Sequence, residues 1–416
     1  MKKEIIFCKK CLYSNFHPFG LTFDENGICS GCKIHDEKNQ LNWNERFKKL
    51  VKLVSPYKSK SGKNYDCIIP VSGSQDSYFT VFIAKYKLGL NPLVVNYNKY
   101  FNTPLGIRNL ANLRTKFDVD ILVQNVNPNS VKKITRYTLM EFGNIYWPIL
   151  AGHTVFPVQT AINYKIPLII WGAHQGLEQV GMFSHTHEVE MTRRYRNDHD
   201  LFGVESENLK LSDNNLKEED TFQYQYPNHK KLDEVGVRGI YLGNYIRWDP
   251  AIQHKQMIKD FNYKSSSFGR TFDCYDYVDC FNYMNLHDYL KLCKLGYSKV
   301  TDHASREIRY NRISRNQGID LVKKYELYPP KYLNLFCKWL GINEKSLEFV
   351  INRSRNKQFW HEKDVDKWRF GGLSTFIKKD KDKDKKKKQK FFQTFKANSK
   401  LEYNRKSEYI TFGKGI

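Results

Sequence analysis

The segment that most constrains the fold is a short apolar run followed by a polar loop and a helical run. Residues 65–71 (YDCIIPV) are mostly apolar, which is typical of a buried strand in a parallel sheet. Residues 78–88 carry apolar side chains at helical spacing and precede Gly89, a residue type that often ends helices. We therefore expect a strand and a helix that are joined by the loop 72–77.

This loop has the sequence SGSQDS, which indicates an anion-binding turn. The unpaired N–H groups at a helix N-terminus favour an anion, and Ser72, Ser74 and Ser77 add hydroxyl donors. Asp76 is placed to hold the Mg²⁺ that accompanies a nucleotide. The chain has no G-x-x-x-x-G-K-[ST] motif, so the loop is not of the Walker type.

Strand-like and helical runs continue to alternate after this loop. Strands are predicted at residues 91–96, 119–123 and 166–171, and helices at 104–116, 128–142 and 149–164. This order predicts an α/β fold with a doubly wound parallel sheet, whose ligands bind at the carboxyl ends of the strands. The loops 72–77, 96–103 and 172–181 should then surround one pocket.

The loop 172–181 contains groups suited to catalysis. Glu178 is a candidate Mg²⁺ ligand or base, and His174 is a candidate for proton transfer because histidine titrates near neutrality. The glycines of this loop, Gly172 among them, allow the backbone to approach a ligand closely. The alternative interpretation is a solvated glycine-rich loop.

The segment 182–198 crowds polar side chains together. His185, Glu188, Arg193 and Arg194 suit substrate binding and acid–base chemistry, with a plain solvated helix as the alternative. Further along, Arg247 lies among aromatic residues that are suited to stacking on a sugar or a base.

Four arginines recur at every third position from residue 306 to residue 315, on an expected helix. Side chains at this spacing share one broad face and suit phosphate binding, so Arg306 and Arg309 are predicted to bind substrate. The alternative is a surface helix whose arginines pair with nearby carboxylates such as Glu307.

The N-terminal region contains two C-x-x-C pairs, Cys8 with Cys11 and Cys29 with Cys32, separated by 17 residues. This spacing predicts one tetrahedral Zn²⁺ site with no open position, and therefore a structural metal. Disulfides are disfavoured without a secretion signal, and a redox C-x-x-C would need a thioredoxin-like setting.

Composition limits the class of protein. The chain has 416 residues, 40% of them hydrophobic, which predicts a folded protein of two or three domains. It shows neither a membrane-span-length apolar run nor a signal peptide, so we expect a cytoplasmic protein without membrane partners. The net charge of +24 raises nucleic acid as a partner, but part of this charge lies in residues 378–416, a lysine-rich tail that we expect to be mobile.

Longer motifs give a specific resemblance. They read W-P-I-L-A-G-H-T-V-F-P-V-Q (147–159), W-G-A-H-Q-G-x-E-Q-V-G-M-F-S-H (171–185), V-R-G-I-Y-L-G-N-Y-I-R-W-D (237–249) and T-D-H-A-S-R-E-I-R (301–309). With the cysteine pairs and the loop 72–77, they resemble the N-acetyl sugar amidotransferases of bacterial surface-glycan synthesis, including those of pseudaminic acid, legionaminic acid and O-antigen. These enzymes are PP-loop ATP pyrophosphatases with an adenine nucleotide alpha hydrolase-like fold. Ser74 departs from their S-G-G-x-D-S signature, which has glycine there.

The resemblance implies a reaction and a set of functional residues. ATP adenylates the oxygen of an N-acetyl group on the sugar substrate, pyrophosphate leaves, and ammonia then displaces AMP to form an acetamidino group. The catalytic residues implied are Asp76, Glu178 and His174, and those that bind ATP are Ser72, Gly73, Ser74, Gln75, Asp76, Ser77, Asn96 and Gly172. The chain shows no glutaminase nucleophile motif, so ammonia is expected from a glutaminase subunit with a cyclase-like barrel subunit.

The resemblance and the cysteine spacing also divide the chain. The expected parts are a zinc knuckle (1–40), the PP-loop domain (41–205), a mainly helical substrate and partner region (206–377), and the tail. The alternative function is that of a tRNA-modifying PP-loop enzyme of the thiolase or lysidine synthetase type. No catalytic C-x-x-C pair follows the loop 72–77, and much of the charge lies in the tail, so nucleic acid is not the expected partner.

Overall fold

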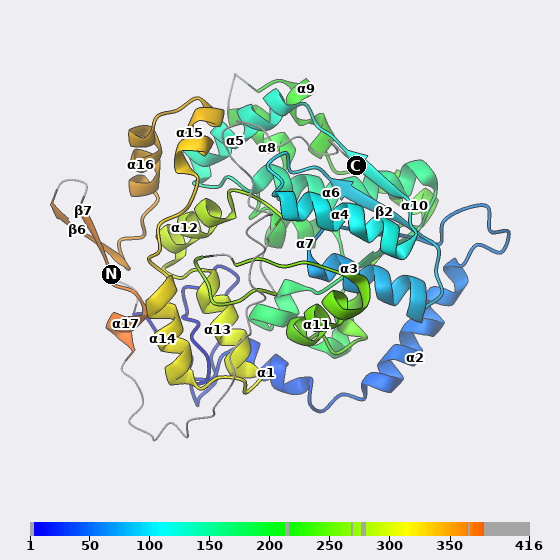
Figure 1. Cartoon of the computed structure of the whole chain (residues 1–416), viewed down its shortest axis with the longest axis horizontal. Coiled ribbons are helices and arrows are strands. Elements are labelled where there is room, and N and C mark those ends of the chain that lie inside the picture. Colours follow the sequence, from blue (N-terminus) through cyan, green and yellow to red (C-terminus); the bar gives the residue numbers. More distant parts are fainter. Residues whose placement is uncertain (1–3, 213–215, 268, 276–279, 365–366, 378–416) are drawn as a thin grey trace.

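A five-stranded parallel sheet forms the centre of the molecule (Figure 1). The structure is a computed structural model, and it describes residues 4–212, 216–267, 269–275, 280–364 and 367–377. The strand order is β3-β2-β1-β4-β5. The strands are β1 (Cys67–Pro70), β2 (Pro92–Tyr97), β3 (Ile121–Gln124), β4 (Leu168–Trp171) and β5 (Arg238–Tyr241). The chain reverses its direction of winding between β1 and β4, so the predicted doubly wound sheet is confirmed.

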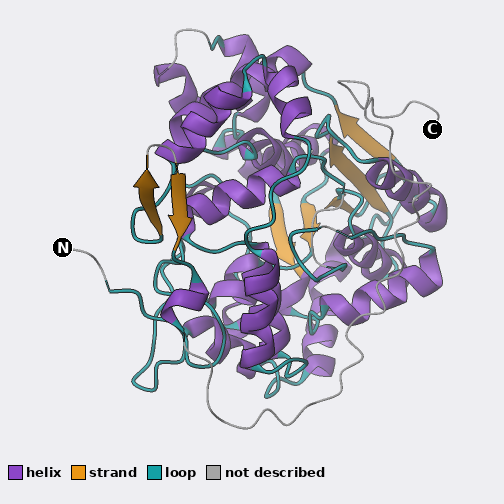
Figure 2. Cartoon of the chain, turned by 60° about the vertical axis from the view of Figure 1, so that its left-hand side comes forward, coloured by secondary structure: helices purple, strands orange, loops and turns teal. Residues whose placement is uncertain are grey.

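Helices enclose both faces of this sheet, and Figure 2 shows its orange strands among the purple helices. Alternate residues of the strands point to opposite faces. Ile69 packs with α2, α3, α4 and α11 on one face, and Ile68 packs with α6 and α10 on the other. The bounds are α2 (Trp43–Val54), α3 (Gln75–Phe82), α4 (Pro104–Phe117), α6 (Trp147–Tyr164), α10 (His229–Val235) and α11 (Pro250–Phe261).

The four strands expected from the sequence are present, with bounds that differ by no more than two residues. The fifth strand, β5, was not expected, and it comes from beyond residue 205. It pairs in parallel with β4 in register, Ile169 opposite Gly239 and Ile170 opposite Ile240. The sheet therefore continues into the segment 206–377, and the predicted domain boundaries stay a prediction.

The C-terminal half is mainly helical, as expected. Its elements are α12 (Met284–Leu295), α13 (Lys299–Arg309), α14 (Arg315–Tyr325), α15 (Leu333–Leu340), α16 (Glu344–Arg353), α17 (Leu373–Phe376), and the hairpin of β6 (Trp360–Asp364) and β7 (Lys367–Phe370). The remaining helices are α1 (Ser30–Glu37), α5 (Pro128–Phe142), α7 (Arg193–Tyr195), α8 (Ser206–Ser212) and α9 (Glu218–Thr221). Among the described residues, no helix has the length and apolar character needed to cross a membrane.

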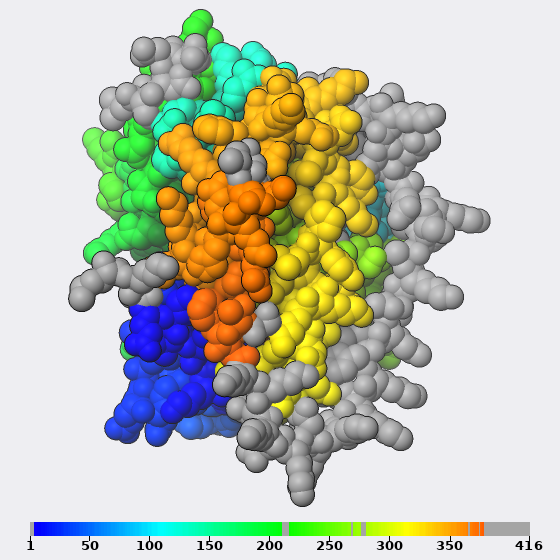
Figure 3. Space-filling view, turned by 90° about the vertical axis from the view of Figure 1, so that its left-hand side faces the viewer, coloured from blue at the N-terminus to red at the C-terminus, as the bar shows by residue number. Residues whose placement is uncertain are grey.

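The N-terminal cysteine region packs against the C-terminal helices rather than standing apart. In Figure 3 the blue N-terminal residues lie beside the orange segment of the C-terminal region. Leu12 shares a buried cluster with Val300 of α13, Ile319 of α14 and Leu373 of α17. The lysine-rich tail, 378–416, lies outside the described residues.

Candidate functional site

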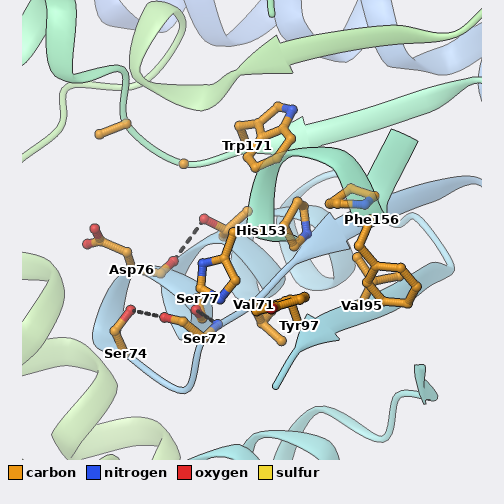
Figure 4. A pocket seen from close by; sticks show the side chains of 15 residues that line it. Val71, Ser72, Ser74, Asp76, Ser77, Val95, Tyr97, His153, Phe156 and Trp171 are labelled. Atoms are coloured by element: carbon orange, nitrogen blue, oxygen red, sulfur yellow. Dashed lines mark hydrogen bonds between the residues drawn. The ribbon is translucent and has the colours of Figure 1, made fainter. Parts of the chain in front are cut away.

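A cavity of about 210 Å³ lies at the carboxyl ends of β1 and β4, the place where a doubly wound sheet binds ligands. One wall is the loop after β1, and a second is the end of β4 with Gly172. The third wall is α6, which contributes His153 and Phe156 (Figure 4). The predicted phosphate loop thus borders a real cavity, together with Gly172.

Hydrogen bonds within the loop fix its shape. The Ser72 N–H donates to Ser77 Oγ over 2.9 Å, and the Ser72 hydroxyl donates to Ser74 Oγ over 3.0 Å. Ser74 is the N-cap of α3, so the first N–H groups of this helix face the loop. This end of the helix favours an anion, which a nucleotide phosphate would supply.

Backbone conformation explains why position 73 requires glycine. It also explains why position 74, which is glycine in the S-G-G-x-D-S signature, tolerates serine. Gly73 has a φ of +83°, and a Cβ there would lie 3.0 Å from the Gly106 carbonyl oxygen. Ser74 has a φ of −82°, which any residue adopts. The serine at position 74 is therefore compatible with the loop conformation.

Asp76 lies in the first turn of α3 and lines two cavities, the one described above and a smaller one. In Figure 4 its carboxylate points away from His153. Gln75 donates to Asp76 Oδ1, and Thr80 donates to the Asp76 carbonyl over 2.8 Å. A carboxylate at the edge of a phosphate site suits Mg²⁺.

The smaller cavity has a volume of about 30 Å³. Its walls come from the loop 173–179 and from α13, and Tyr13 of the N-terminal region and Trp248 complete them. Glu178 lines it, and Glu178 Oε2 accepts a hydrogen bond of 2.5 Å from the buried Lys38 Nζ. Burial lowers the pKa of Lys38, and the Glu178 carboxylate opposes that shift. The pairing of Lys38 with Glu178 was not predicted from the sequence. The two residues are 140 positions apart, and no local motif marks this lysine.

His174 lines neither of these cavities. Its ring lies against those of Tyr195, Tyr241 and Phe183, and Nδ1 lies 3.4 Å from the Tyr195 hydroxyl. Burial lowers the pKa of His174 to about 3, so its imidazole is neutral near pH 7. This geometry favours a structural role over the proton transfer predicted for it.

His153 is a cavity residue that the sequence did not single out, although it lies inside the 147–159 motif. Burial, followed by the charge of Lys99, lowers the pKa of His153 to about 3. Its Nε2 is buried and makes no hydrogen bond among the described residues. Asn96, predicted to bind ATP, instead donates over 2.8 Å to the Val71 carbonyl and fastens β2 to the start of the loop.

The residues predicted to bind substrate do not form one site. His185 is buried, and its Nδ1 lies 2.8 Å from Glu37 Oε2. Glu188 pairs with Lys49 over 2.6 Å. Arg193 and Arg194 border a separate open surface hollow, and Arg247 donates to the Lys38 carbonyl over 2.8 Å.

Arg306 and Arg309 do line the smaller cavity, but the expected continuous helix through residue 315 is wrong. The helix α13 ends at Arg309 and α14 begins at Arg315. Arg306 donates to Asp273 Oδ2 over 2.8 Å, and Arg312 donates to Asp249 Oδ2 over 2.5 Å. These two arginines therefore already have carboxylate partners inside the protein, as in the alternative interpretation.

The four N-terminal cysteines form one buried cluster, with sulfur atoms within 4.8 Å of one another. The Cys8–Cys32 and Cys11–Cys29 sulfur distances are 3.9 and 3.6 Å. A Zn²⁺ tetrahedron with bonds of about 2.3 Å has edges of roughly 3.8 Å, so this cluster fits a structural zinc.

Arg309 connects this cluster to the smaller cavity. Its Nη1 donates to the carbonyls of Glu178 and Gln179 over 3.0 and 2.9 Å. Its Nη2 lies 3.6 Å from Cys29 Sγ and 3.9 Å from Cys11 Sγ. Arg309 is thus a link between the cysteine cluster and the loop that carries Glu178, and its contacts within the protein differ from the phosphate contact predicted for it.

Part of the chain is similar to a known protein family. Residues 265–373 match the family described as LPS biosynthesis protein WbpG-like, C-terminal domain. The matched residues include α12 to α16, so they supply the α13 wall of the smaller cavity and not the loop after β1.

Two other proteins are similar to parts of this chain. The uncharacterized protein MJ1599 of Methanocaldococcus jannaschii is 28% identical over 118 residues, which are 28% of this chain and 42% of that protein. The NMN synthetase from Francisella tularensis shares 13% identity at a TM-score of 0.28, over 49% of this chain and 93% of the synthetase. So low a TM-score supports no statement about activity.

Proposed function

We propose that this protein is an ATP-dependent amidotransferase that converts an N-acetyl group of a bacterial surface-glycan sugar to an acetamidino group. The observation that carries the proposal is the position of the SGSQDS loop, which borders the cavity at the switch point of the sheet. The C-terminal match to a WbpG-like LPS biosynthesis domain supports a glycan substrate. The motif resemblance supports the choice of reaction.

In this proposal ATP occupies the larger cavity with its phosphates at the start of α3. The hydroxyls of Ser72 and Ser74 and the helix N–H groups hold the departing pyrophosphate. Asp76 would hold Mg²⁺, which neutralises the charge that develops on the phosphates. Gly73 lets the backbone approach the phosphates in a conformation that other residues adopt only under strain.

The chemistry requires activation because the oxygen of an amide is a poor leaving group. The amide oxygen attacks the α-phosphorus, pyrophosphate leaves, and the amide N–H loses its proton, which gives an O-adenylated imidate. Ammonia adds to the imidate carbon and the C–O bond to AMP breaks. A glutaminase subunit with a cyclase-like barrel subunit is the proposed source of this ammonia.

Nucleotide products test the proposal. The purified protein with Mg²⁺, ammonium and a panel of acetamido sugars should release AMP and pyrophosphate only in the presence of the correct sugar. Release of ADP and phosphate would contradict it. Turnover that depends on tRNA instead of sugar would favour the tRNA-modifying alternative.

A further inference from the structure

The smaller cavity admits only a very small ligand. Its volume of about 30 Å³ exceeds the roughly 10–15 Å³ that one water needs and cannot hold a sugar or a nucleotide. Ammonia and ammonium are similar in size to water. Gln175 is the exposed member of the lining, so it marks the mouth of this cavity.

Among the described residues that line the cavity, one carboxylate oxygen is buried and has no hydrogen-bond partner. Glu178 Oε2 is bound to Lys38, but Glu178 Oε1 is buried and has no partner within the described part of the chain. Asp302 is already engaged, because it accepts from Tyr13 over 2.9 Å and from Lys291 over 2.6 Å. A buried carboxylate oxygen without a donor is unfavourable, so the cavity fits a ligand that carries N–H groups.

The supply of open oxygen ligands argues against a divalent cation inside this cavity. A divalent metal ion requires several oxygen ligands at once, whereas Glu178 Oε1 is the one lining oxygen that is buried without a partner in the described part of the chain. One N–H donor satisfies this oxygen.

The position of the cavity suits delivery of a nucleophile. Asp76 and Ala173 line both cavities, so a molecule in the smaller one lies next to the phosphate loop. An attacking group there lies beside two residues that also border the nucleotide cavity. It would reach the activated carbon without crossing bulk water.

We propose that the smaller cavity binds the nitrogen nucleophile, and that Glu178 Oε1 accepts a proton from ammonium to release ammonia. The inference rests on the proposed amidotransfer and adds to it a site for the second reactant. The N–H bond of ammonium breaks and its electron pair stays on nitrogen. That pair forms the C–N bond at the imidate carbon, and AMP leaves with the amide oxygen.

The test separates adenylation from amination with the full-length protein. Exchange of labelled pyrophosphate into ATP, with sugar and without ammonium, reports adenylation alone. Glu178→Gln should keep this exchange and raise the KM for ammonium in amidine formation by about tenfold or more. Glu190→Gln is the control, because Glu190 pairs with Arg238 away from the cavity and should behave like the wild type.

A second variant tests the size of the cavity independently of Glu178. Gln175→Ala widens the mouth and should raise the use of methylamine relative to ammonium. If Glu178→Gln lowers pyrophosphate exchange as much as it lowers amidine formation, the proposed ammonium site is overturned. The site is also overturned if Gln175→Ala uses methylamine and ammonium in the same ratio as the wild type. Absence of exchange in the wild type with every sugar would instead count against the proposed function.

Discussion

At the scale of single residues, backbone conformation and burial decide which predicted side chains can act. Gly73 needs its positive φ, and Asp76 borders both cavities. His174, chosen because histidine titrates near neutrality, is enclosed by aromatic rings with a pKa of about 3. The sequence identifies residue types, whereas burial sets their protonation.

Gly73→Ala should impair the phosphate loop. The added Cβ meets the Gly106 carbonyl, and the positive φ costs about 1–3 kcal/mol for a residue other than glycine. We expect a lower Tm in thermal unfolding and reduced AMP formation. Ser74→Gly is the matched control, since the φ of −82° makes no demand on the residue type. Equal loss of AMP formation in both variants would contradict this explanation.

Asp76→Ala should remove ATP turnover without unfolding the protein. Its carboxylate is the proposed Mg²⁺ ligand beside the departing pyrophosphate, so AMP formation should fall by roughly a hundredfold or more. Circular dichroism should remain that of the wild type. Retention of most of the activity would exclude Asp76 from the site.

At the scale of elements, the regular alternation of strands and helices made most of the sheet predictable. The strand β5 was missed because it contains the charged Arg238 and the glycine Gly239, and because its aromatic residue suggested ligand stacking instead. The arginine spacing suggested one helix, but spacing alone does not show where a helix ends. The contact of Arg309 with Cys29 of the cysteine cluster joins residues 280 positions apart, so no local sequence pattern predicts it.

Cys11→Ser should lose the metal and loosen the N-terminal region. We expect about one zinc per chain in the wild type and clearly less in the variant, because a tetrahedral site needs all four ligands. Metal analysis of protein purified without chelator measures this, together with the Tm. A variant that keeps both its zinc and its Tm would rule out the predicted metal site.

Arg309→Met should weaken zinc binding and also disturb the loop 173–179, which carries Glu178. The guanidinium lies between two cysteine sulfur atoms and two loop carbonyls, so its removal takes a positive charge away from the expected zinc site. We expect faster zinc release to a chelator and a higher KM for ammonium. Lys33→Met, which removes an exposed cation paired with Asp24, serves as the control. Release rates equal to those of the control would show that Arg309 does not link the two regions.

At the scale of the whole molecule, three distant parts of the chain assemble the candidate site. Tyr13, the loop 173–179 and α13 meet at the smaller cavity, although they are separated by more than a hundred residues. The sequence predicted the phosphate loop and the cysteine cluster from local motifs. It could not predict the smaller cavity, because that depends on how the helical C-terminal region packs on the sheet.

The whole molecule should lose stability on acidification. Burial lowers the pKa of five histidines to about 3 or 4: His17, His153, His174, His254 and His287. The unfolded chain therefore binds more protons below a pH of about 6.5, and the free energy of unfolding falls as the pH decreases. Glu326, whose pKa burial raises to about 7, acts in the opposite direction but is a single group. Thermal unfolding between about pH 7.5 and pH 5 should show a falling Tm; a constant Tm would contradict these pKa values.

The origin of the new nitrogen atom tests the central claim most directly. Purified protein should be incubated with ATP, Mg²⁺, an acetamido sugar and either ordinary or ¹⁵N-labelled ammonium, followed by mass spectrometry of the sugar. We predict a product in which NH replaces one oxygen atom, with the label incorporated and AMP formed in equal amount. AMP formation with an unchanged sugar, or a modified sugar without the label, would contradict amidotransfer at this site.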